Sequence, residues 1–136
     1  MLSVDATVLR VFLHVLAATV WVGGQLTLAG LVPALRGIAP DAPRAAARRF
    51  NRIAWPAYGV LVATGIWNLF ERDFTDRSTE WQVTVFVKLL VVGLSGISAL
   101  VHSTTSSRTV LAVGGALAGL SSLGALLLGV QLTFGG

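Results

Sequence analysis

The sequence predicts an all-α integral membrane protein in which four transmembrane helices form an up-down bundle. The first observation is composition: of 136 residues, 54% are hydrophobic and 12% are charged. That charged fraction is about half of the ~25% that is usual in soluble domains. The second observation is that the apolar residues fall in four long runs with short connections. Runs of this length are typical of transmembrane helices, and short connections favour antiparallel neighbours in a single domain, 1–136.

We expect the spans at about residues 6–35, 53–70, 81–102 and 109–134. The first run is longer than a ~30 Å hydrocarbon core requires, so we expect it to tilt or protrude. Residues 36–52, 71–80 and 103–108 are interpreted as loops, although Arg44 to Arg52 can begin an interfacial helix. Pro56 is placed in the first turn of the second span, where its missing N–H costs little.

The arginines predict the topology. The chain has a net charge of +4, with nine arginines and one lysine. Five of the arginines fall in residues 36–52, which hold a single aspartate. By the positive-inside rule this loop is cytoplasmic, and both termini lie on the outer side of the inner (plasma) membrane. Arg10 counts mildly against that orientation. Topology explains the concentration of arginines better than nucleic-acid binding does, so the expected partner is the lipid bilayer.

Lys88 is the one cation inside an apolar run. It lies in VTVFVKLLVVGLSGISALV, within the third span. A cation at membrane depth costs roughly 2.5–3.5 kcal/mol on insertion scales, and such residues usually face a bundle interior with a function. His14, in the first span, is expected at a similar depth, about 10–12 Å from the same side of the membrane. His102 lies some 21 Å from Lys88 along the third span and is excluded as a partner of His14.

Polar and small residues recur at helical spacing on three of the spans. Residues three, four or seven apart lie on one face of a helix. We therefore expect each of these faces to line a common interior cavity. The three sets are His14, Trp21 and Gln25 on the first span; Tyr58, Gly65 and Asn68 on the second; and Lys88, Ser95 and His102 on the third.

A neutral histidine and a deprotonated lysine can serve as the two axial nitrogen ligands of a haem iron. Burial assists, because desolvation disfavours the charged form of the amine. The structural alternative is that Lys88 extends its amine to the membrane surface while His14 donates to a backbone carbonyl. Both interpretations are open at this point.

The segment His14–Leu26, HVLAATVWVGGQL, carries a resemblance to known membrane proteins. Its His, six intervening residues and Trp-x-Gly-Gly resemble the motif of CopD-domain (copper resistance protein D) proteins. It also resembles the HemJ-type protoporphyrinogen oxidases, which are four-span haem proteins, and their later Trp…Lys-Leu-Leu segment is matched by Trp81–Leu90. The HemJ resemblance implies His14 and Lys88 as haem ligands and a porphyrinogen oxidation. The CopD resemblance implies copper uptake or tolerance.

Three functions follow as expectations. The first is a CopD/HemJ-like protein that binds haem b between the first and third spans, for electron transfer to a redox partner or for porphyrinogen oxidation. Trp21, Tyr58 and Asn68 would line its pocket. The second is a copper-resistance or copper-transport component, although a chain without cysteine offers few of the soft ligands that copper(I) favours. The third is a structural subunit without a cofactor.

The fourth span also predicts a homodimer. Gly115 and Gly119 form a GxxxG pattern. Such small residues let two helix backbones approach closely in a membrane.

Overall fold

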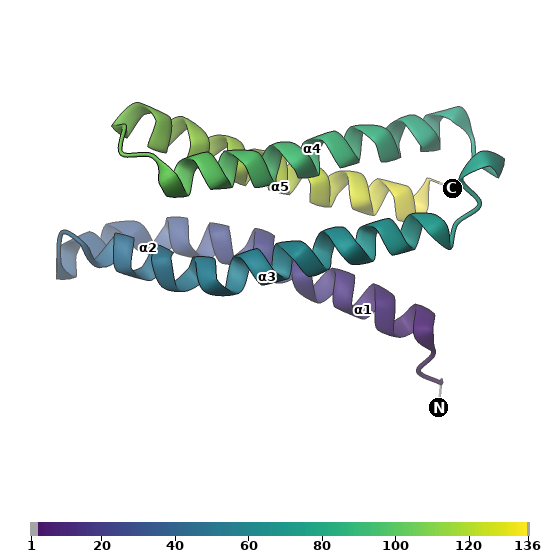
Figure 1. The fold of residues 1–136 in the computed structure, drawn as a ribbon, viewed down its shortest axis with the longest axis horizontal. Coiled ribbons are helices and arrows are strands. Elements are labelled where there is room, and N and C mark those ends of the chain that lie inside the picture. The colour runs from purple at the N-terminus through teal and green to yellow at the C-terminus, as the bar shows by residue number, and fades with distance from the viewer. Residues whose placement is uncertain (1–2, 136) are drawn as a thin grey trace. The chain divides into compact units, whose positions relative to one another are not determined.

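The computed structural model describes residues 3–135, and this part of the chain is helical with no strand (Figure 1). Four helical segments are long and apolar enough to cross a membrane: Ala6–Ile38, Ala42–Phe70, Thr79–Thr104 and Arg108–Phe134. The prediction of an all-α, four-span membrane protein is therefore confirmed.

The first span is a continuous rod made of three pieces. Helix α1 (Ala6–Ala18) passes into a π-helical turn, η1 (Thr19–Gly23), and then into α2 (Gly24–Ile38). Asp5 caps the start of α1, because its carboxylate accepts a hydrogen bond from the backbone N–H of Val8 at 2.8 Å. The sequence pattern gave no sign of the π turn. Such turns occur frequently at functional sites.

Helix α3 (Ala42–Phe70) begins well before the predicted second span. Most of the segment 36–52, interpreted as a loop, is helical, and the connection between α2 and α3 is only residues 39–41. The proline in the first turn, Pro43, explains part of the difference, because proline is tolerated there. Pro56 consequently lies inside α3 and not in its first turn.

The second half of the chain holds α4 (Thr79–Thr104) and α5 (Arg108–Phe134), preceded by a short 3-10 turn, η2 (Phe74–Asp76). Serine hydroxyls cap both long helices: Ser78 accepts from the N–H of Trp81, and Ser107 accepts from the N–H of Val110. These bounds agree with the predicted third and fourth spans to within two residues.

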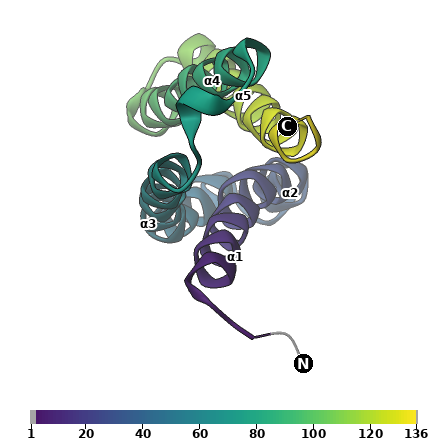
Figure 2. The ribbon, with the colours of Figure 1, turned by 90° about the vertical axis from the view of Figure 1, so that its right-hand side faces the viewer.

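The chain divides into two compact units, one ending at Arg72 and the other beginning at Asp73. In unit 1 the α1–α2 rod packs antiparallel to α3, and in unit 2 α4 packs antiparallel to α5 (Figure 2). The expectation of a single domain stays a prediction. Many large apolar side chains are exposed on all four spans, which suits helices whose outer faces contact lipid tails.

Candidate functional site

Two pairs of polar side chains meet between α1 and α3, and we call these four residues the polar ladder: Arg10, His14, Thr64 and Asn68. Arg10 and His14 are one helical turn apart, as are Thr64 and Asn68, so each pair of neighbours lies on one face of its helix. Because the two helices are antiparallel, Arg10 meets Asn68 and His14 meets Thr64. The ladder concentrates the polar chemistry of unit 1 on a single helix–helix interface.

The hydrogen bonds of Thr64 fix the tautomer of His14. The Thr64 hydroxyl lies 2.6 Å from the backbone carbonyl of Val60, and a carbonyl can only accept, so the single hydroxyl proton is donated there. The Thr64 oxygen is also 2.9 Å from Nδ1 of His14 and must accept from it. His14 is therefore protonated on Nδ1. A histidine held in this way by its other nitrogen is the usual arrangement of a metal ligand.

Gly65 makes room for the His14 ring. A Cβ atom built on Gly65 would lie 3.4 Å from Cε1 of His14, so the imidazole packs directly on the backbone of α3. The described partner of Nδ1 is the Thr64 hydroxyl, and the structural alternative, in which His14 donates to a backbone carbonyl, stays a prediction.

Arg10 is a cation held almost out of solvent, with 7% of its surface exposed. Its Nε donates to Oδ1 of Asn68 at 2.8 Å, and Nη1 lies 3.5 Å from Oε2 of the more exposed Glu71. The guanidinium also lies 5.7 Å from the centroid of the Trp67 ring, and the Trp67 indole N–H donates to Glu71. Each partner comes from the last turns of α3 or its C-terminal end. This set of contacts joins the start of α1 to the end of α3.

Three aromatic rings pack together farther along the same interface. Trp21, in the π turn η1, is 3% exposed. Its ring centroid lies 4.5 Å from that of Tyr58 and 5.5 Å from that of Trp55. Tyr58, Gly65 and Asn68 therefore do share a face, as predicted, and that face packs on the first span.

In unit 2, Lys88 extends across a glycine of the neighbouring helix. Its Nζ would lie 3.0 Å from a Cβ built on Gly129, so Gly129 leaves room for the amine on α5. Ser95 donates to the carbonyl of Ala118 at 3.4 Å, and His102 donates from Nδ1 to the carbonyl of Leu111 at 2.6 Å. The predicted stripe of Lys88, Ser95 and His102 is thus a real face, and it faces α5.

The contacts described so far lie within each unit. His14 belongs to unit 1 and Lys88 to unit 2, so a common cavity lined by both, and their pairing, stay predictions. The two glycines of the GxxxG pattern have different surroundings. The His102 ring lies 3.0 Å from a Cβ built on Gly115, whereas a Cβ on Gly119 meets nothing within 4 Å. A dimer through this face stays a prediction as well.

Sequence reasoning missed two members of the polar ladder. Arg10 was considered only as a charge near the membrane surface, although its spacing of four residues from His14 indicated a shared face. Thr64 carried no such signal, because no spacing on one helix reveals which residue on another helix it meets.

Within residues 3–135, no three histidine, cysteine, aspartate or glutamate side chains gather into a group that could hold a metal ion. Any metal held by this part of the chain would therefore need fewer ligands of these types, as a haem iron does. No family model, curated protein or solved structure matches the chain. The resemblance to CopD-domain and HemJ-type proteins accordingly rests on the motif of residues 14–26 and the segment 81–90 alone.

Proposed function

We propose that this multi-pass membrane protein binds haem b and acts in membrane electron transfer or porphyrinogen oxidation. His14 and Lys88 would be the two axial ligands. The observation that carries the proposal is the hydrogen bond from His14 Nδ1 to Thr64, whose own proton goes to Val60. This bond holds the ring in one orientation, as a metal-ligating histidine requires, and Nε2 would be the nitrogen that binds the iron.

The donor set fits such a cofactor on chemical grounds. A haem iron needs only one or two protein ligands, and a buried imidazole nitrogen is a common one. Haem b, when bound, would supply a one-electron iron centre. The chain's own residues would orient the ligand and exclude water: Thr64 fixes the imidazole, and Trp21 and Tyr58 form an apolar wall. Asn68 would act indirectly, because its oxygen accepts from Arg10.

We also propose that both termini lie on the extracytoplasmic side of the inner membrane. Arg10, the one residue that counted against this orientation, is buried and paired with Asn68 and Glu71, so an acid offsets its charge locally. The arginines near the α2–α3 connection are exposed, and they decide the orientation under the positive-inside rule.

Copper handling gains no specific support from the two units, since the ligand groups that copper would need do not gather in the described residues. The alternative that experiment must distinguish from haem binding is a structural subunit without a cofactor. Under that alternative the polar ladder only joins α1 to α3, and replacing His14 changes stability and nothing else.

The test is the visible absorption spectrum of the detergent-purified protein, as isolated and after addition of haem. We expect a Soret band that shifts on reduction. It should weaken strongly in His14→Ala and shift in Lys88→Met, because each change removes one ligand. His102→Gln is the matched control, since His102 is the other histidine and donates to Leu111 within unit 2. No haem uptake by a helical wild-type sample, or equal loss in His14→Ala and His102→Gln, would overturn the proposal.

A further inference from the structure

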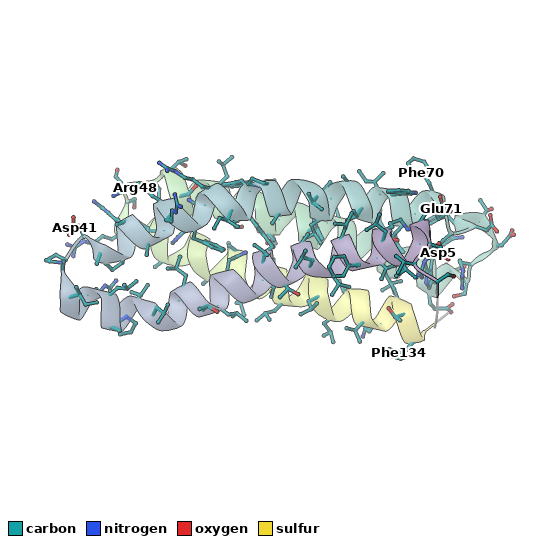
Figure 3. All side chains as sticks on the ribbon, turned by 90° about the horizontal axis from the view of Figure 1, so that it is seen from below. Asp5, Asp41, Arg48, Phe70, Glu71 and Phe134 are labelled. Atoms are coloured by element: carbon teal, nitrogen blue, oxygen red, sulfur yellow. The ribbon has the colours of Figure 1, made fainter. Side chains whose placement is uncertain are left out.

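Five arginines lie exposed around the α2–α3 connection: Arg36, Arg44, Arg48, Arg49 and Arg52. The sequence places one acid among them, Asp41, at the start of α3. Figure 3 shows Arg48 and Asp41 at this end of unit 1, with Asp5 and Glu71 at the opposite end. The side chains of the five arginines have no ion pair or hydrogen bond within residues 3–135. Arg10, by contrast, has three partners.

The geometry of α3 orders these charges. Arg44, Arg48 and Arg52 follow one another at four-residue intervals, so they form one stripe along the helix, and Arg49 lies beside it. The apolar part of α3 begins directly after the stripe, at Ile53, and the helix is uninterrupted from Ala42 to Phe70. At ~1.5 Å per residue, Arg48 and Arg52 lie within about 8 Å of the apolar boundary along the axis.

We propose that this arginine stripe binds the phosphate groups of anionic phospholipids. The position of the arginines beside the apolar part of α3 and their positive charge together favour lipid as the ligand. Arg48 and Arg52 belong to a helix long and apolar enough to span a membrane and lie just before its apolar part, where lipid headgroups would be, and no acid of residues 3–135 pairs with them. Guanidinium groups match phosphate oxygens with two parallel hydrogen bonds. Basic residues at this depth gain affinity from anionic lipid. A soluble acidic protein would contact Arg44 more readily than Arg52, which is nearest to the hydrocarbon.

The experiment uses the whole chain, extracted in mild detergent from a membrane of phosphatidylcholine with one quarter phosphatidylglycerol. Native mass spectrometry then gives the ratio of the two lipids that stay bound. We expect phosphatidylglycerol to be enriched over its share of the membrane. Arg48→Gln with Arg52→Gln should reduce that enrichment roughly tenfold, which is about 1.4 kcal/mol.

Arg72→Gln with Arg77→Gln is the matched control, because it removes the same charge from the exposed segment between α3 and α4. This control should retain the enrichment. Circular dichroism of each variant verifies that its helices are intact. Retention of the two lipids in the proportion of the membrane by the wild-type protein, or an equal loss in the two double variants, would overturn the proposal. An acidic protein as the true partner would give the first of these results.

Discussion

The two units are both pairs of antiparallel helices, but different side chains hold them together. In unit 1 aromatic side chains pack between η1 and α3, and two hydrogen bonds join α1 to α3 from side chain to side chain, Arg10 to Asn68 and His14 to Thr64. In unit 2 the interface is lined by small residues. Its buried positions include Ser95, Gly96, Ser98, Gly114, Ala118, Ser121 and Ser122.

The cross-helix bonds of unit 2 end on backbone carbonyls, those of Ala118 and Leu111. Helices in lipid associate through close packing and interhelical hydrogen bonds, because the apolar solvent gives no hydrophobic drive. Both units use both means, and they differ in where the cross-helix bonds end: on side chains in unit 1 and on backbone carbonyls in unit 2. The comparison teaches that two spans can be joined without pairs of polar side chains. The polar ladder of unit 1 is therefore the place to test the role proposed for His14.

The largest expected loss of stability comes from removing the buried cation of unit 1. Arg10→Met deletes a charge-assisted hydrogen bond to Asn68 and the contact with Glu71. We expect the free energy of unfolding to fall by about 1.5–3 kcal/mol. Denaturant unfolding in detergent, followed by circular dichroism, measures it. Arg72→Met, at an exposed site, should change it by no more than about 0.5 kcal/mol, and an equal effect of both variants would contradict our account of Arg10.

A comparable test of unit 2 replaces a small residue of its interface with a large one. Ala118 is 3% exposed and its carbonyl accepts from Ser95. Ala118→Leu should force α4 and α5 apart and destabilise by about 1–3 kcal/mol. The control is Leu120→Ala on the 68%-exposed outer face. If the control proved as costly as Ala118→Leu in the same unfolding measurement, close packing would not be what joins this unit.

The sequence predicted the four spans because long apolar runs are local signals. It also identified the faces of His14, Tyr58 and Lys88, because residues at helical spacing share a face whatever they contact. It did not predict which helix each face contacts, since that depends on how two helices align. Thr64 illustrates this limit. The start of α3 was predicted only in part: Arg44 to Arg52 were expected to be able to begin an interfacial helix, whereas the helix begins at Ala42, with Pro43 in its first turn.

A smaller effect is expected at the glycine pair of the first span. A Cβ on Gly24 would collide with the ring of Phe50, whereas one on Gly23 meets nothing within 4 Å. Gly23→Ala should stabilise the rod by up to about 1 kcal/mol through helix propensity. Gly24→Ala should lack this gain because Phe50 must move. Thermal unfolding of the two variants side by side gives the difference, and equal stabilisation would show that Phe50 gives way without cost.

A change in stability of similar size is expected from Thr64→Val, which removes the acceptor of His14 at nearly constant volume. We expect a loss of about 0.5–1.5 kcal/mol, the usual contribution of a neutral hydrogen bond. The more informative readout is haem affinity, which should fall because the imidazole is no longer oriented. Thr84→Val on α4, where the hydroxyl bonds only within its own helix, is the control. If the Thr64→Val protein took up haem like the wild type, Thr64 would not be needed to orient the His14 ligand.

The most direct test of the central claim is the protonation of His14 in the protein without haem. The chain holds two histidines, so ¹⁵N-histidine labelling gives two sets of ring-nitrogen NMR signals, and His102→Gln assigns them. Our account predicts that His14 is neutral with its proton on Nδ1, and that Thr64→Val changes this pattern. A neutral His14 protonated on Nε2, with the lone pair on the nitrogen facing Thr64, would contradict it.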